Sequence, residues 1–218
     1  MSDRHSGSRA SFVSDRPLLA TPTVVASLSE ADFARASLVV PDLAAYADFE
    51  DWRCAREARQ IGLAMAGVDA PLVCVSLTGF LAWVRLTGSI ADEAGLDRFA
   101  ATLRAFRTLD EPFAFAVVSE RDFAAHSPAV AALSGHGDFL SWSRFRRSTR
   151  VKAKLARAGI IEVPISIDEY VAWRACIGDN PAATIDRFAQ AVLEHFASDF
   201  SEGHRDSAGG VTGRALRR

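Results

Sequence analysis

The sequence predicts a helix-rich α+β protein formed by a tandem duplication of a β-α-α-β-α-α unit. A shift of ninety residues aligns the chain with itself, so that "SEADFA" (29–34) falls on "SERDFA" (119–124) and "FLAW" (80–83) falls on "YVAW" (170–173). Self-similarity at one nearly constant offset is the signature of a repeated structural unit. Each copy also alternates short β-rich runs with longer stretches of helical periodicity.

The two copies cover residues 20–107 and 110–197, and we expect them to form one fused domain. A sheet of only two strands is marginally stable in water. The four short strands are therefore expected to pool in one sheet, covered by helices and related by a pseudo-twofold axis. Residues 1–19 and 198–218 are mostly polar, and we expect them to be disordered tails.

Each unit is expected to open with a strand and a capped helix. The runs "TVVASL" (23–28) and "FAFAVV" (113–118) are rich in β-branched and aromatic residues, which favour strands. Ser29 and Ser119 follow these runs, each with an aspartate three residues later. This spacing resembles the capping box that opens many helices.

A long helical stretch is predicted next, over residues 41–66 and 128–158. In the second copy, "SGHG" (134–137) should interrupt the helix, because glycines at a turn favour non-helical backbone. Gly67 and Gly159 stand where a C-capping glycine is expected.

The second half of each unit is predicted to be a strand followed by two helices. The strands are 72–77 and 162–167, and both are rich in aliphatic residues. Thr78 and Asp168 are the expected N-caps of the helices that follow.

The last helix of each unit begins after a glycine that should end the preceding helix, Gly88 or Gly178. It is expected to begin near Asp92 in the first copy and at Asn180-Pro181 in the second. Its apolar face is predicted to bury Leu96, Phe99, Leu103 and Phe106, matched by Ile185, Phe188, Val192 and Phe196. The four tryptophans are expected to lie in the core.

Composition places the chain among ordinary globular proteins. Apolar residues make up 49% and charged residues 24%, and the net charge of −2 excludes a polycation that binds nucleic acid with its whole surface. No apolar run approaches the roughly 18 residues of a membrane span, and no signal peptide is expected. The three cysteines form no CxxC motif, so we expect reduced thiols and a cytoplasmic location. Cys74 and Cys176 are expected to be small core residues.

The residues that the copies share are of the kinds that build a fold. They are aromatic and aliphatic residues, glycines and helix caps, and no histidine or cysteine is shared. We therefore assign no catalytic residue and expect no metal and no cofactor. A localised function should lie where the copies differ or in the seam between them. The shared charged residues that stand beside aromatic residues are Asp48 with Asp138, Asp97 with Asp186, and Arg98 with Arg187.

The sharpest difference between the copies is the stretch "RFRRSTRVKAKLAR" (144–157), which is basic and contains no acidic residue. On a helix, Arg146, Arg150 and Lys154 fall on one stripe. One interpretation is a patch that binds the phosphates of a nucleic acid or another anionic partner. The other is a solvated helix face that balances acidic neighbours, which the scarcity of interleaved aromatic residues favours. The candidate anion-binding residues are Arg144, Arg146, Arg147, Arg150, Lys152, Lys154 and Arg157.

Three functions are compatible with these patterns. The first, which the lack of a catalytic motif favours, is a non-catalytic cytoplasmic binding or interaction protein with a protein partner. The second is an enzyme or a small-molecule binder whose pocket lies in the seam between the two units. The third is a nucleic-acid-associated accessory protein that uses residues 144–157.

Overall fold

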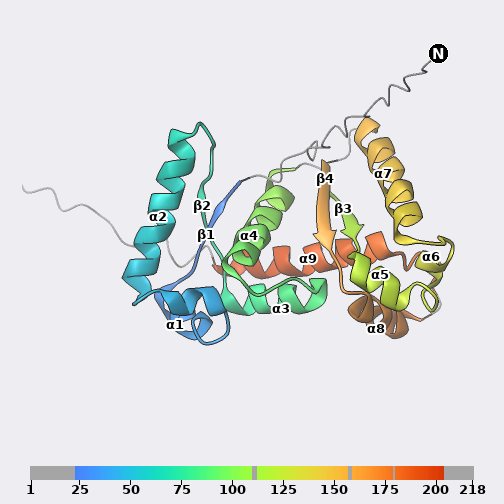
Figure 1. Cartoon of the computed structure of the whole chain (residues 1–218), viewed down its shortest axis with the longest axis horizontal. Coiled ribbons are helices and arrows are strands. Elements are labelled where there is room, and N and C mark those ends of the chain that lie inside the picture. Colours follow the sequence, from blue (N-terminus) through green and yellow to red (C-terminus); the bar gives the residue numbers. More distant parts are fainter. Residues whose placement is uncertain (1–22, 110–111, 157–158, 179, 204–218) are drawn as a thin grey trace, which may run out of the picture.

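The computed structural model describes residues 23–109, 112–156, 159–178 and 180–203 of the chain (Figure 1). The described part is helix-rich and contains two small parallel sheets of two strands each. The expected tail 1–19 lies outside the described residues, as do the residues after Gly203. Helix α9 continues past residue 197, where the second unit was expected to end.

The elements follow one another in the same order in the two halves of the chain. The first half contains β1 (Val25–Ser27), α1 (Glu30–Ala36), the 3-10 helix η1 (Pro41–Ala45), α2 (Phe49–Met65), β2 (Leu72–Cys74), α3 (Leu77–Thr87) and α4 (Glu93–Thr108). The second half contains β3 (Pro112–Val117), α5 (Glu120–His126), α6 (Ala131–Ser134), α7 (Phe139–Leu155), β4 (Gly159–Pro164), α8 (Ile167–Ile177) and α9 (Ile185–Gly203). Each half therefore has the predicted elements, with one short helix (η1 or α6) added before its long helix.

The prediction that four strands pool in one sheet is wrong. β1 pairs only with β2 and β3 only with β4 within the described residues, and both pairs are parallel. Figure 1 shows the two sheets apart, with α4 between them. Helix α4 contacts β1, β2 and β4, and α9 contacts β3. Helices thus supply the apolar cover that a neighbouring strand pair was expected to supply.

The register of the two sheets is related by the same shift of ninety residues. Ala26 pairs with Val73 in the first sheet, and Ala116 pairs with Val163 in the second. Both alanines are buried completely or almost completely. The backbone groups of these two alanines take part in the polar clusters described below.

The buried apolar side chains of both halves form one contiguous core. Phe99 of α4 packs against Phe80 and Trp83 of α3, and meets the ring of Phe196 of α9 edge to face at 5.6 Å between centroids. The predicted apolar face of the last helices is confirmed, with Phe106 only half-buried. Three of the tryptophans are buried as predicted, whereas Trp173 is half-buried at the edge of the core.

Helix caps follow the predicted residues in part. Ser29 and Ser119 accept hydrogen bonds from the backbone of the aspartates three residues later, which confirms both caps. Thr78 and Asp168 are not caps, because Ser76 and Ser166 take that role two residues earlier. Each serine stands two residues after the end of its strand, so the helices begin sooner than apolar periodicity indicated.

The start of the last helix differs between the halves. Asp92 caps α4 as predicted, and its Oδ1 accepts a hydrogen bond from the Gly95 amide at 2.5 Å. Asn180 does not cap α9, since its side chain closes a turn on the amide of Ala182. Helix α9 begins at Ile185, where Thr184 Oγ1 accepts from the Arg187 amide at 3.1 Å.

Two further predictions are corrected by the structure. Gly159 is the first residue of β4 and does not cap a helix. Cys74 and Cys176 are exposed, because β2 keeps its side chains largely in solvent and Cys176 lies on the outer face of α8. Among the described residues, no helix is both long and apolar enough to cross a membrane.

Two glycines provide a matched test of the backbone. Gly88 ends α3 with φ of +64°, in the left-handed region, so Gly88→Ala should cost about 1–2 kcal/mol. Gly62 lies on the exposed side of α2 with open space around its Cα, so Gly62→Ala should stabilise the protein by about 0.5–1 kcal/mol. Urea unfolding followed by circular dichroism measures both. Equal effects of the two substitutions would contradict the assigned helix end.

Candidate functional site

Two buried arginines, ninety residues apart, mark corresponding places in the two halves. Arg56 of α2 is 3% exposed and Arg146 of α7 is 8% exposed, and no other charged side chain is buried within the described ranges. A buried charge requires a partner of opposite charge and further hydrogen bonds. The partners of these two arginines define two polar clusters, which we call the first and the second arginine cluster.

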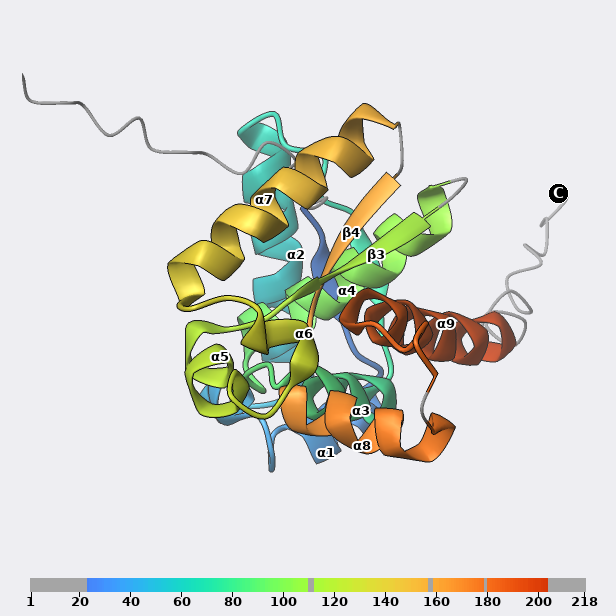
Figure 2. The same ribbon diagram turned by 90° about the vertical axis from the view of Figure 1, so that its right-hand side faces the viewer.

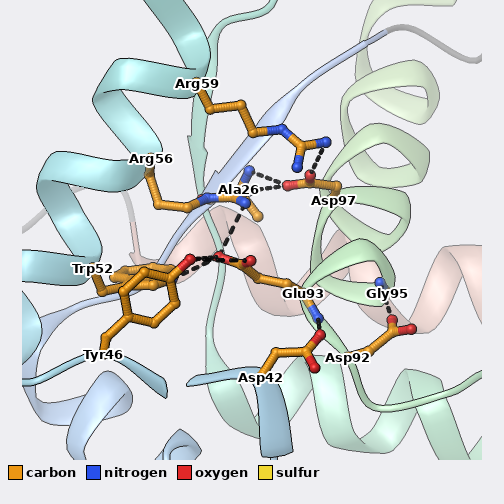
Figure 3. A network of polar contacts seen from close by, with 10 residues as sticks. All are labelled: Ala26, Asp42, Tyr46, Trp52, Arg56, Arg59, Asp92, Glu93, Gly95 and Asp97. Atoms are coloured by element: carbon orange, nitrogen blue, oxygen red, sulfur yellow. Dashed lines mark hydrogen bonds and ion pairs between the residues drawn. The ribbon is translucent and has the colours of Figure 1, made fainter. Parts of the chain in front are cut away.

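In the first arginine cluster, Arg56 joins β1 to α4 (Figure 3). Its Nε donates to the carbonyl of Ala26 at 3.0 Å, and its Nη2 pairs with Asp97. The Ala26 amide also donates to Asp97, at 2.8 Å. Arg59 reaches the same carboxylate from the half-exposed side of α2, with Nη2 3.1 Å from Oδ2. The strand, the long helix and the last helix are thereby tied together at one point.

Glu93 fills the remaining space of the first arginine cluster. Its Oε1 accepts hydrogen bonds from Trp52 Nε1 at 3.0 Å and from Arg56 Nη1 at 3.3 Å. The Tyr46 hydroxyl lies 3.3 Å from both carboxylate oxygens (Figure 3). Burial and the nearby Glu93 carboxylate raise the pKa of Tyr46 above its ordinary value, so the hydroxyl remains a donor at neutral pH. The amide of Glu93 is bound by Asp42 at 3.1 Å.

The second arginine cluster repeats part of this arrangement. The Ala116 amide donates to Asp186 at 2.8 Å, and Arg146 Nη2 donates to the Ala116 carbonyl at 2.8 Å. Arg146 also binds Asp186 through both terminal nitrogens, Nη1 at 2.9 Å and Nη2 at 2.5 Å. Asp186 corresponds to Asp97 at a shift of eighty-nine residues.

The guanidinium of Arg146 is turned relative to that of Arg56. Arg56 uses Nε for the strand carbonyl and keeps one terminal nitrogen for Glu93. Arg146 donates to Asp186 through both terminal nitrogens, and its buried Nε has no hydrogen-bond partner. Its guanidinium carbon lies 3.8 Å from the centroid of the Phe115 ring. A buried donor without an acceptor costs about 1–3 kcal/mol, so this arginine is the less satisfied of the two.

A pocket of about 410 Å³ opens beside the second arginine cluster. It lies between α6, α7, α8 and the segment that leads into α9; in Figure 2 α6 stands between α7 and α8 at this end of the molecule. A second cavity of about 420 Å³ shares Tyr170 and Arg174 with it along α8. Volumes of this size are typical of small-molecule sites. The pocket residues used below are Ala132, Trp142, Phe145, Arg146, Arg174 and Asp186.

The pocket is open because the second half lacks the side chains that fill this place in the first. At a shift of eighty-nine residues Glu93 corresponds to Ala182, and segment 180–184 contains no acidic residue. At a shift of ninety residues Asp42 corresponds to Ala132. Helix α9 starts at Ile185, which aligns with Leu96, so it also lacks the first turn of α4.

Two larger side chains line the pocket where the first half has small aliphatic ones. Arg174 on α8 corresponds to Val84, and Phe145 on α7 corresponds to Ala55. Phe145 is 50% exposed and stands beside Trp142, at 6.1 Å between ring centroids. His136 packs against both rings. The pocket therefore has an aromatic wall and two arginines. Among the described residues, no side chain forms a hydrogen bond or an ion pair with Arg174.

The candidate anion-binding residues from the sequence do not form one surface. Arg146 faces the core and Asp186, so it does not belong to an exposed stripe. Arg150 is half-buried and pairs with Glu162 of β4 at 2.8 Å. Arg144, Arg147, Lys152 and Lys154 are exposed on α7, and Arg157 lies outside the described residues. Binding of an anionic polymer by the exposed members stays a prediction.

The helical periodicity of the basic stretch alone predicted that Arg146 faces solvent. It did not indicate which residues line the pocket. The signal was present in the alignment of the two copies. Arg56 with Arg146 and Asp97 with Asp186 are shared charges of opposite sign, and charges kept at equivalent core positions indicate an ion pair. Within the described residues, no group of three or more metal-ligating side chains could hold a metal ion.

Comparison with known proteins adds no relative. No protein-family model matches the chain, and neither the curated proteins nor the solved structures include a match.

Proposed function

We propose that this protein is a non-catalytic binding protein for a small organic molecule, with its site in the pocket between α6, α7, α8 and the start of α9. The observation that carries the proposal is an aromatic wall, Trp142 and Phe145, standing over a buried arginine in a pocket of about 410 Å³. Aromatic side chains with a few convergent polar groups are the usual lining of small-molecule sites.

A tandem duplication of the β-α-α-β-α-α unit explains why the second half has a pocket where the first half has a closed cluster. The shared register of the sheets and the two arginine clusters support this origin. In the first copy, Glu93 and Tyr46 close the cluster from within. The second copy lacks that glutamate and has a half-exposed phenylalanine at the opening. The cluster of the first copy then stabilises the fold, and the corresponding place in the second copy binds the ligand.

The seam between the copies is a weaker candidate for the site. Phe99 and Phe196 fill it with aromatic contact, and α4 and α9 pack directly on one another. The pocket proposed here is lined by residues 131–186 alone. The function hypothesis of a small-molecule binder is thus retained, with its site moved into the second unit.

The proposal predicts that a neutral aromatic probe binds beside Trp142. The probe is phenylacetamide, titrated into uniformly ¹⁵N-labelled protein, with the Trp142 indole N–H signal assigned by its loss in Trp142→Phe. We expect that signal to shift with a saturable dependence on probe. Phe145→Ala should weaken binding about five- to tenfold, since an aromatic pair contributes about 0.5–1.5 kcal/mol beyond area burial.

The control is Val151→Ala, on the same helix and also about half-exposed, which should leave the affinity unchanged. Both variants should unfold close to the wild-type temperature, because neither side chain is in the core. A Trp142 signal that does not respond to the probe, or an equal loss in both variants, would refute the proposed site.

A further inference from the structure

We infer that the ligand of this pocket is an organic acid with an aromatic body, whose carboxylate takes the place that the Glu93 carboxylate takes in the first half. This inference rests on the proposed function and names the class of its ligand. It follows from the two arginine clusters, because one of them contains the carboxylate and the other does not.

The first arginine cluster shows which donors surround the carboxylate. Trp52 Nε1 and Arg56 Nη1 both donate to Glu93 Oε1, and the Tyr46 hydroxyl completes the set. An arginine together with neutral N–H and O–H donors makes charge-assisted hydrogen bonds to a carboxylate. Glu93 thus occupies a carboxylate site supplied by the chain itself.

Two of these donors have counterparts at the pocket. Trp142 corresponds to Trp52, and its Nε1 donates to no other residue in the described part of the chain. Arg146 corresponds to Arg56, and Trp142 and Arg146 both line the pocket. The third donor, Tyr46, is replaced by His136, which packs against the same tryptophan.

Arg146 has a second arrangement available to it, which the first half displays. With a carboxylate beside it, Arg56 gives Nε to the strand carbonyl and one terminal nitrogen to Glu93. A ligand carboxylate would let Arg146 turn in the same way, so that its unpartnered Nε would donate to the Ala116 carbonyl. One terminal nitrogen would then be released from Asp186 to the ligand.

The charges around the pocket also favour an anion. The first arginine cluster sets two arginines, Arg56 and Arg59, against two carboxylates, Glu93 and Asp97. At the pocket, two arginines, Arg146 and Arg174, face the single carboxylate of Asp186. The first turn of α9 also lines the pocket, and a helix N-terminus attracts negative charge. One further negative charge would restore the balance that the first half has.

The test compares three probes that share an aromatic body: phenylacetate, phenylacetamide and 2-phenylethylammonium. Isothermal titration calorimetry on the full chain measures each affinity. Phenylacetate should bind at least about tenfold more tightly than the amide, because a hydrogen bond to a charged group is stronger than its neutral equivalent. The ammonium probe should bind more weakly than the amide.

Arg174→Gln separates the charge from the pocket. This substitution should remove most of the preference for phenylacetate and leave the affinity for phenylacetamide unchanged. The matched control is Arg85→Gln on α3, an exposed arginine one position beyond the counterpart of Arg174, which should change neither affinity. The Arg146 Nε–H resonance should also shift with phenylacetate and not with the amide.

Each result decides one of the two proposals. Equal affinities for phenylacetate and phenylacetamide would overturn the carboxylate inference and leave the pocket as a binding site. Binding of neither probe would overturn the proposed function itself. A preference for phenylacetate that survives in Arg174→Gln and leaves the Arg146 resonance unmoved would place the acid elsewhere and contradict the inference.

Discussion

Replacing Arg56 with methionine should lower the free energy of unfolding by about 3–5 kcal/mol, the usual cost of removing one partner from a buried ion pair. The substitution leaves Glu93 without its cation and Asp97 with only the half-exposed Arg59, and it leaves the Ala26 carbonyl without its donor. For a chain of this length, each kcal/mol lowers the midpoint temperature by about 2–4 °C. The loss should therefore be visible both in urea and in thermal unfolding.

Two matched substitutions rank the contributions of the arginines. Arg59→Met removes a side chain that is 53% exposed and pairs with Asp97, so it should cost less than about 1 kcal/mol. Arg146→Met removes the cation of one carboxylate, Asp186, whereas Arg56→Met removes a cation that two carboxylates share. The cost of Arg146→Met should therefore fall between the other two. An effect of Arg56→Met no larger than that of Arg59→Met would contradict the role of the first arginine cluster.

Phe99→Ala is expected to cost about 3–5 kcal/mol, the range measured when a large aromatic side chain is removed from a core. Phe99 is 1% exposed and contacts Phe80 and Trp83 in its own half and Phe196 of α9 in the other. The cavity left by its ring would therefore border both halves. Loss of this ring weakens the seam as well as the first unit.

The comparison for Phe99→Ala is Phe145→Ala, because Phe145 has the same chemistry and is half-exposed. Phe145→Ala should change the free energy of unfolding far less, since surface substitutions usually stay within about 0.5 kcal/mol. Urea denaturation at one temperature gives both values. Similar losses for the two variants would show that the α4–α9 seam is not packed as described.

Local signals in the sequence predicted most individual elements. Ser29, Ser119 and Asp92 cap helices because a short polar side chain before an apolar-periodic run can bind the free amides of the first turn. Gly88 ends a helix because it adopts a positive φ without strain. Helix caps and helix ends depend on a few neighbouring residues, so they can be predicted from a short segment of the sequence.

Features that depend on distant residues were predicted less well. The four strands were expected in one sheet, yet α4 and α9 cover the two pairs separately. Arg146 sits on a helix most of whose other cations face solvent, and its partner Asp186, forty residues later, explains why it is buried. The pocket depends on where α9 begins, and Thr184 sets that start in place of the expected Asn180.

The expectation that a localised function lies where the copies differ remains the basis of the proposal. The differences that matter are single positions inside an otherwise shared cluster, Glu93 against Ala182 and Val84 against Arg174. The stretch 144–157 was predicted as a candidate anion-binding patch because its basic residues follow one another without an acidic residue. Its burial in the fold is not continuous, since Arg146 points inward while Arg147 is exposed.

A crystal structure of the protein with bound phenylacetate would show whether the ligand carboxylate takes the place of the Glu93 carboxylate. We expect a carboxylate oxygen within hydrogen-bonding distance of Trp142 Nε1 and of one terminal nitrogen of Arg146, with Arg146 Nε turned to the Ala116 carbonyl as Arg56 Nε is to Ala26. Phenylacetate bound away from Trp142, or an Arg146 that keeps both terminal nitrogens on Asp186, would contradict it.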